Sequence, residues 1–436
     1  MKNVSALEPL PSASYRRYLF SLLFLLYLFD YMDRMVIVSL FPYLKADYGI
    51  TDTQCGLLVS AVYWSILIFS FPVSILVDRW SRKKSIGLMA ILWSLATLAC
   101  AFTRNFTQLF TARTAIGIGE AGYAPGGTAM ISTMFPKEQR AKVLGLWNAS
   151  IPLGSALGIG LGGLVAEHFG WRYALGLVAL PGMVIALLFF TVKDYKTITL
   201  VKTVVQSRGQ VQVKMQFSDM ARQFTHNPTL LFNNLAFAAN VFVTTSLLTW
   251  LPTYFHRFEG LTMSHAGIKG GSVMLLAIIG APLGGYLADL WMKKRQNARM
   301  VFPAISSAMT ALLLFIAFGF FRGQVQYMIL LGAGVCAVAF VPAAVAVTQD
   351  VVHPGMRAIS LSINVIIQHL LGSSLGPLFI GVLSDDFGLE KAMVFLPAFA
   401  LLGSLLFLIG ARFYAKDLAA ADPINAKQTI VETDNC

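Results

Sequence analysis

The first long apolar stretch of this chain contains three ionisable residues, Asp30, Asp33 and Arg34. A charged side chain at the centre of a bilayer costs at least about 2.5–3.5 kcal/mol, so such residues usually have a function. Asp30 precedes Asp33 by three residues and Arg34 by four, which predicts one shared face of a helix. Carboxylates that exchange an arginine as they gain and lose protons can form a proton relay.

A second apolar stretch carries Arg113 and Glu120, which lie two helical turns apart on one stripe. Glu120 falls near the centre of this stretch, and we expect it to share Arg34 with the carboxylates of the first helix. The alternative is a buried ion pair that only fixes helix packing. Arg113 lies closer to the end of the stretch, where a packing role and a coupling role are both open.

Polar and aromatic side chains inside the apolar stretches are candidates for contact with a solute. Any of them could instead hydrogen-bond a neighbouring helix, an interaction worth about 0.6 kcal/mol on average. The residues that we expect to line a central cavity are Tyr27, Tyr31, Tyr123, Asn148, Asn240 and Gln368.

The composition of the 436 residues indicates a membrane protein. Apolar residues make up 56% of the chain, charged residues make up 12%, and the mean hydropathy is +0.68. A soluble globular protein has about twice that charged fraction, so most of the apolar surface must face lipid. The four cysteines are scattered, which indicates neither a disulfide framework nor a metal site.

Twelve segments are long and apolar enough to span a bilayer, since a span needs about 20 mainly apolar residues. We therefore expect an all-α protein with two six-helix bundles around a central cavity. The expected domains are an N-terminal arm (1–17), a first bundle (18–192), a basic linker (193–227), a second bundle (228–413) and a tail (414–436). The expected spans are 18–44, 53–77, 85–103, 106–134, 142–166, 172–192, 229–255, 264–288, 300–321, 324–349, 358–383 and 390–413.

Lysine and arginine concentrate on one side of this predicted topology. The arm, the even-numbered loops and the tail contain 24 of them, whereas the odd-numbered loops contain 7. The cationic side faces the cytoplasm, so we expect both termini there, in the inner membrane of a bacterium. This topology and anionic lipid headgroups account for the net charge of +12, and no nucleic-acid partner is expected.

The two halves of the chain repeat each other. The segment from Leu153 matches the segment from Leu371 at a constant offset of 218, and Pro72 and Pro282 each precede an Asp and a basic cluster. In transporters built from such parallel repeats, the substrate site lies near the bilayer midplane between the halves. The matched residues are Gly154, Ser155, Leu157, Gly158, Gly163, Phe169, Gly170 and Ala174, which recur as Gly372, Ser373, Leu375, Gly376, Gly381, Phe387, Gly388 and Ala392.

The segment Asp78-Arg79-Trp80-Ser81-Arg82-Lys83-Lys84 resembles the signature between helices 2 and 3 of the major facilitator superfamily, with Ser74 and Ser81 at its glycine positions. Arg113-x-x-x-Gly117-x-Gly119 resembles a second signature of that superfamily. The resemblance covers essentially the whole chain and implies a secondary transporter that works by alternating access. It also implies a conformational, gating role, which we assign to Asp78, Arg79, Arg82, Arg113 and Asp289.

Tyr31-Met32-Asp33-Arg34 resembles two branches of the superfamily, the Spinster-like lipid transporters and the anion:cation symporters of sugar acids. The segment 117–123 and Trp250-Leu251-Pro252 are more similar to the Spinster-like branch, although Asp30 replaces a common Asn. That resemblance implies protonation of Asp33 and Glu120, with Arg34 between them. We expect these residues and Asp30 to couple protons to the movement of a small organic or amphiphilic solute.

Other function classes fit the sequence less well. A sugar-acid symporter would need a second cation to hold the substrate carboxylate, and Lys269 is the nearest candidate. An intramembrane enzyme would need a metal site or a nucleophile site. A sensor built on a transporter fold would usually have a longer cytoplasmic extension. The absence of a Walker lysine argues against an ATP-driven pump. We expect no catalytic residue, no metal and no cofactor, and we expect the proton gradient to drive transport. The expected substrate is lipid-like or a small molecule, the expected partners are membrane lipids, and the expected state is a monomer.

Overall fold

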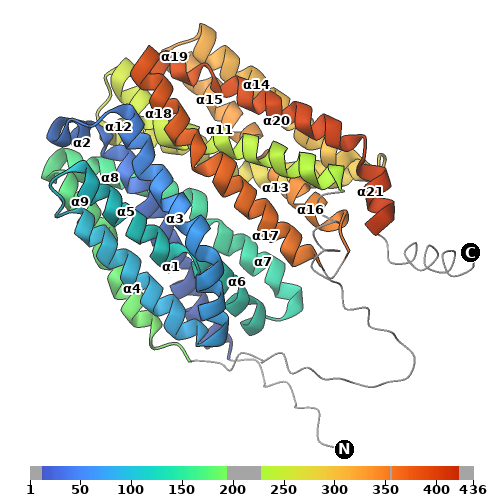
Figure 1. Cartoon of the computed structure of the whole chain (residues 1–436), viewed down its shortest axis with the longest axis horizontal. Coiled ribbons are helices and arrows are strands. Elements are labelled where there is room, and N and C mark those ends of the chain that lie inside the picture. The colour runs from blue at the N-terminus through green and yellow to red at the C-terminus, as the bar shows by residue number, and fades with distance from the viewer. Residues whose placement is uncertain (1–11, 194–226, 354–355, 422–436) are drawn as a thin grey trace, which may run out of the picture. The chain divides into compact units, whose positions relative to one another are not determined.

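A computed structural model describes residues 12–193, 227–353 and 356–421, and every regular element in those ranges is helical (Figure 1). The predicted all-α fold class is confirmed. Parts of the expected arm (1–11), linker (194–226) and tail (422–436) lie outside the described residues, and the domain boundaries drawn from the sequence stay a prediction.

Two helices of the first half begin at residues whose side chains cap them. Ser81 accepts a hydrogen bond from the Lys84 N–H at 3.1 Å, and Asn105 accepts one from the Gln108 N–H at 2.9 Å. Each bond satisfies a backbone donor that a helix start leaves without a partner. The helices of the first half are α1 (Ala13–Ser39), α2 (Phe41–Tyr48), α3 (Asp52–Arg79), α4 (Arg82–Cys100), α5 (Phe106–Glu120), α6 (Tyr123–Met134), α7 (Lys137–Asn148), α8 (Ser150–Phe169) and α9 (Trp171–Phe189).

The second half contains a short π-helix, η2, between α17 and α18. Such wide turns occur rarely and often at functional sites. Pro342 lies in the first turn of α16, where a missing N–H costs little, and it interrupts the span that includes α15. The elements are α11 (Pro228–Glu259), α12 (Met263–Leu275), α13 (Ala277–Met292), α14 (Ala298–Phe320), α15 (Gly323–Ala339), α16 (Val341–Asp350), α17 (Arg357–Ile367), η2 (Gln368–Ser373), α18 (Leu375–Phe387), α19 (Leu389–Met393), α20 (Leu396–Ala411) and α21 (Tyr414–Ala421).

Ten helical segments in the described part of the chain are long and apolar enough to cross a membrane, and each matches one predicted span. The two other predicted spans correspond to α1 and to α5 with α6. Helix α1 has 27 residues, about 40 Å, and contains three buried charged residues, Asp30, Asp33 and Arg34. The span 106–134 is interrupted after Glu120, so that it consists of two shorter helices.

Glycines allow the helices of each half to approach closely. A Cβ added to Gly154 would lie 2.4 Å from the Leu28 carbonyl oxygen, and one added to Gly372 would lie 2.8 Å from that of Ala238. The glycines differ by 218 positions and their partners by 210, so the second half repeats the contact between α1 and α8 with different residues. The same two offsets relate the contact of Gly158 with Met32 to that of Gly376 with Phe242.

The described residues group into two compact units. Unit 1 takes its residues from Met1–Ile50, Leu57–Thr197 and Phe255–Gly271, and within it α1 packs against α6, α7, α8 and α9 (Figure 1). Unit 2 takes its residues from Thr51–Gly56, Ile198–Tyr254 and Ser272–Cys436. An apolar cluster that includes Phe237, Phe340 and Phe407 lies at the centre of unit 2.

Candidate functional site

Arg34 joins two carboxylates inside unit 1. Its Nη2 lies 2.9 Å from Asp30 Oδ2, and its Nε lies 2.8 Å from Glu120 Oε2. Both carboxylate side chains are fully shielded, and the Arg34 side chain is 9% exposed. The one-turn spacing on α1 explains the contact with Asp30. The expected sharing of Arg34 between helix 1 and Glu120 is therefore present in the structure.

Asp33 does not take part in this bridge, contrary to the expectation that Arg34 lies between Asp33 and Glu120. Asp33 immediately precedes Arg34, so the two side chains leave α1 about 100° apart. Asp33 instead accepts a hydrogen bond from the Thr97 hydroxyl on α4, and its Oδ1 lies 3.7 Å from Arg113 Nη1. The bridging carboxylate on α1 is Asp30.

Arg113 is only 1% exposed and holds three elements together. It donates to the carbonyl oxygens of Leu58 at 3.3 Å, Asp33 at 3.1 Å and Arg34 at 3.2 Å. These bonds tie the backbone of α1 to that of α3, beside the charged side chains. The geometry indicates a positioning role for Arg113, while the gating role that we assigned to it stays a prediction.

Glu120 occupies an electrostatically demanding position, because it is the last residue of α5. The C-terminal end of a helix carries a partial negative charge, which makes a cationic partner more valuable to a carboxylate there. Arg34 supplies that partner. Gly122, in the break that follows Glu120, is tightly packed, since a Cβ there would lie 2.6 Å from Val73.

An aromatic cluster covers one side of the charged group. The rings of Tyr27 and Trp147 stack with centroids 4.2 Å apart, and the Tyr123 ring lies 5.5 Å from that of Tyr27. Tyr31 and Tyr63 place their rings 4.8 Å and 5.9 Å from the Arg34 guanidinium carbon. Cation–π contacts of this kind compensate part of the cost of burying an arginine.

The cavity candidates outside this cluster occupy three different environments. Asn148 is exposed at the end of α7, whereas Asn240 is buried and donates to the Ala236 carbonyl of its own helix at 2.9 Å. Gln368, at the start of η2, donates to Asn364, whose amide donates to Asn234 Oδ1 at 2.8 Å. Unit 2 thus contains a chain of neutral amides, and the role of each candidate stays a prediction.

The gating candidates are only partly visible. The side chains of Asp78 and Arg79 lie outside the described residues, and Arg82 is the first residue of α4. Asp289 is largely exposed and pairs with Arg299, with Oδ1 and Nη2 3.3 Å apart. Lys269, considered above as a clamp for a substrate anion, has its Nζ 2.5 Å from Glu259 Oε2.

Sequence reasoning missed several partners in the charged cluster. Thr97, Tyr63 and Trp147 carry no signal in the sequence, because threonine and aromatic residues are common inside apolar helices. Their contacts depend on how α3, α4 and α7 pack around α1. Among the described residues, no group of three His, Cys, Asp or Glu side chains is arranged to hold a metal ion.

The family model of the Major Facilitator Superfamily matches residues 23–377 of this chain. The chain belongs to the Major Facilitator Superfamily. The match includes most of α1, all of α5 and the whole charged cluster. The chain is accordingly a transporter and not an enzyme, and its resemblance to the Spinster-like branch is confirmed by the relatives described next.

Curated relatives come from both branches recognised in the sequence. Protein spinster homolog 1 of Xenopus laevis is 26% identical over 95% of this chain and 84% of its own length. The sphingosine-1-phosphate transporter SPNS2 of Mus musculus is 27% identical over 90% of this chain and 76% of its own length. The hexuronate transporter of Bacillus subtilis (strain 168) is 27% identical over 64% of this chain and 66% of its own length.

Solved structures of low sequence identity share the fold. A bacterial homolog of the human lysosomal transporter Spinster, crystallised inward-facing and unoccupied, has a TM-score of 0.81 at 22% identity and covers 93% of this chain and 99% of its own. The D-xylose-proton symporter has a TM-score of 0.70 at 16% identity and covers 90% of this chain and 97% of its own. The predicted major facilitator fold is confirmed.

Proposed function

We propose that this protein is a proton-coupled secondary transporter of an amphiphilic, lipid-like solute. The observation that supports coupling most strongly is the charge balance of the cluster in unit 1. Asp30, Asp33 and Glu120 contribute three carboxylates, whereas Arg34 and Arg113 contribute two guanidinium groups, and all five residues are at most 8% exposed. A buried excess of one negative charge is costly, and one bound proton would remove it.

Arg34 offers a way to convert proton binding into a structural change. Glu120 Oε1 and Asp30 Oδ1 accept no hydrogen bond from the described residues, so each carboxylate has an oxygen free to take a proton. Protonation of Glu120 would weaken its electrostatic attraction to Arg34, so that the guanidinium would remain paired with Asp30 alone. Loss of the proton would restore the bridge between α1 and α5, and thereby bias alternating access.

The relatives support an amphiphilic solute as the first choice. Several spinster proteins match most of this chain, and one of them carries a sphingosine-1-phosphate transporter name. Lys269 is paired with Glu259 in unit 1, so it is already engaged rather than held ready for a substrate carboxylate.

A second candidate is a proton symporter of a small organic anion, for which the hexuronate transporter of Bacillus subtilis is the supporting relative. In that case Arg34 would serve both the protonated carboxylates and the substrate anion. For either candidate we propose a monomer in a bacterial inner membrane with both termini in the cytoplasm, on the basis of the lysine and arginine distribution.

The test is substrate-driven proton movement in liposomes that contain the purified protein and a pH-sensitive dye. Lysolipids, sugar acids and cationic dyes are added in turn to the parent and to the Asp33→Asn and Glu120→Gln variants. We expect a lysolipid to start proton flux in the parent, and we expect Glu120→Gln to abolish it, because a glutamine amide cannot take up and release a proton.

Asp47→Asn is the matched control, since Asp47 is a half-exposed carboxylate of unit 1 outside the cluster. It should leave the flux unchanged. Flux with sugar acids but not lysolipids would replace the first candidate by the second. Lysolipid transport without proton movement in the parent would contradict proton coupling and keep the transporter assignment.

A further inference from the structure

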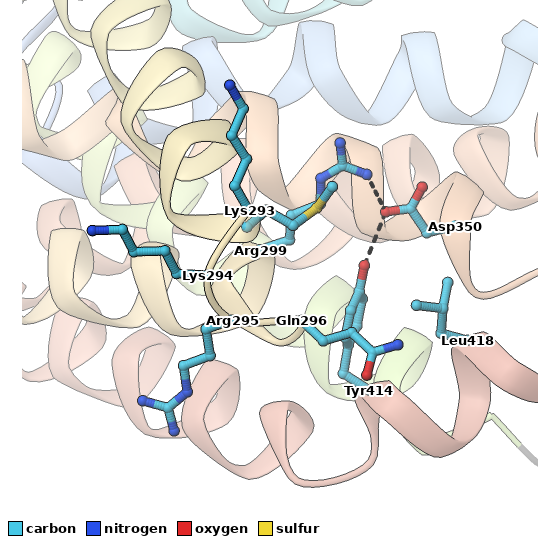
Figure 2. Close-up of a pocket in the computed structure, with 9 residues that line it drawn as sticks. Lys293, Lys294, Arg295, Gln296, Arg299, Asp350, Tyr414 and Leu418 are labelled. Atoms are coloured by element: carbon cyan, nitrogen blue, oxygen red, sulfur yellow. Dashed lines mark hydrogen bonds and ion pairs between the residues drawn. The ribbon is translucent and has the colours of Figure 1, made fainter.

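Unit 2 contains a basic hollow of about 370 Å³ where α13 ends and α14 begins, beside α21. Figure 2 shows Arg299 and Tyr414 converging on Asp350, while Lys293, Lys294 and Arg295 extend from the connecting turn. Nothing in the proposed transport mechanism uses this hollow.

The bonded network at the hollow already neutralises its one carboxylate. Arg299 Nη1 lies 2.6 Å from Asp350 Oδ2, and the Tyr414 hydroxyl donates to the same oxygen at 3.0 Å. Burial raises the pKa of Tyr414, so this hydroxyl remains a donor. Asp350 is therefore satisfied by two partners and is poorly placed to neutralise the cations of the turn.

The cations of the turn form no ion pair within the described residues. Lys293, Lys294 and Arg295 are exposed, and all three line the hollow. The adjoining first turn of α14 carries no acidic residue and no side-chain cap from Asn297. Cationic side chains beside the positive end of a helix favour an anion with several oxygen acceptors, such as a phosphate group.

A row of exposed leucine side chains runs along α13 toward this hollow. Leu283, Leu287 and Leu290 are 40–45% exposed, and their spacing of three and four residues puts them on one side of the helix. Lys294, which lines the hollow, follows Leu290 by four residues, so this row of leucines leads to a cation of the turn. The arrangement suits a molecule with an anionic head and an apolar chain, rather than a free ion.

We propose that this hollow binds the phosphate of an anionic phospholipid, with Lys293, Lys294 and Arg295 around the headgroup and the acyl chain along α13. Basic pockets between membrane helices are known to hold anionic headgroups where the positive side of the protein meets the bilayer surface. The site is separate from the charged cluster, because it uses residues of unit 2 alone.

Thermal unfolding of the full chain in detergent tests this site at low ionic strength. Phosphatidylglycerol, phosphatidylcholine and inorganic phosphate are added at equal concentrations. We expect phosphatidylglycerol to raise the melting temperature by roughly 2–4 °C, as a ligand specific for the folded state does, and the other two to have little effect. K293Q/K294Q/R295Q should lose most of that rise.

The matched control is K142Q/R412Q/K416Q, which removes the same charge from exposed positions outside the hollow and should keep the rise. The charge-preserving K293R/K294R should also keep it. Native mass spectrometry counts bound phosphatidylglycerol on each variant directly, even if a variant is less stable. The proposal fails if the first triple variant binds as much lipid as the parent, if phosphatidylcholine gives an equal rise, or if inorganic phosphate alone reproduces it.

Discussion

Helices α1 and α11 occupy the same place in the two units but differ in charge. The glycine contacts relate them by an offset of 210, which pairs Asp30 with Asn240 and Arg34 with Thr244. In unit 1 these positions join a buried ionic cluster, whereas in unit 2 the Asn240 amide and the Thr244 hydroxyl bond to carbonyls of α11 itself.

The close packing of these helices therefore does not depend on the charged side chains beside it. Glycine on one helix and a backbone carbonyl on the other give both units their close helix contact, and that contact needs no charge. At these positions the described residues carry ionic groups in unit 1 and neutral groups in unit 2. If the proposed coupling is right, unit 1 binds the proton, and unit 2 supplies neutral amides such as those of Asn234 and Asn364.

The largest expected effect is that of Arg34→Gln, which removes the guanidinium from between two buried carboxylates. Breaking a buried pair by deleting one partner typically costs about 3–5 kcal/mol, because a charge is left unpaired. Thermal unfolding in detergent should show this loss at neutral pH, and acid should reduce it as the carboxylates are protonated. Thr244→Val, the equivalent change in unit 2, should cost about 1 kcal/mol or less. Equal losses in the two variants would contradict the asymmetry.

Asn240→Asp introduces a carboxylate into unit 2, at the position equivalent to Asp30 of unit 1. No arginine faces this position among the described residues, so an ionised carboxylate there should cost about 2.5–3.5 kcal/mol. Thermal unfolding as a function of pH measures this cost, which should shrink in acid. Asp30→Asn, the reverse exchange, leaves two carboxylates for two arginines and should be tolerated much better. A stable Asn240→Asp protein at neutral pH would count against the charge argument.

The shared packing predicts similar effects in both units for a bulkier residue at the glycine contacts. Gly158→Val and Gly376→Val each place a side chain against a backbone carbonyl, at 2.5 Å and 2.7 Å for the first carbon alone. Overpacking of this kind costs about 1–3 kcal/mol. Unfolding midpoints should therefore fall by comparable amounts, and an undisturbed midpoint in one variant would show that the two contacts are not equivalent.

The smallest effect concerns two exposed ion pairs, one in each unit, that share one equivalent position of the repeat. Arg172 lies 3.0 Å from Asp47, whereas Glu390, 218 positions after Arg172, pairs with Arg322. A hydrogen bond from the Trp171 indole holds the pKa of Asp47 below its usual value. The stabilisation should be complete above the pKa of the unfolded state and disappear as the pH falls through the folded-state pKa.

Asp47→Asn should therefore lower stability by less than about 1 kcal/mol at neutral pH and make it less sensitive to acid. Thermal unfolding between pH 3 and pH 7 provides the measurement, with Glu390→Gln as the counterpart in unit 2. A greater sensitivity to acid in Asp47→Asn than in the parent would contradict the sign of the pKa shift.

Local patterns predicted much of the fold and part of the site. Apolar stretches of about 20 residues located the spans because a helix in lipid must satisfy its own backbone, and that rule acts within one segment. The contact between Asp30 and Arg34 followed from their spacing on one helix. The close packing of Gly122 against Val73 and Met89, in the break between Glu120 and Tyr123, could not be read locally, since these partners come from other helices.

The sequence alone determined which charges enter the membrane and which glycines recur in the two halves, because both are properties of residue type and spacing. Only the tertiary structure decided that Arg34 bridges Asp30 and Glu120, and that Asp33 turns to Thr97 and Arg113. Neighbouring residues on a helix point in different directions, and the partner that each one meets is set by the helices packed around it. The basic hollow of unit 2 likewise exists only because α21 lies against the turn between α13 and α14.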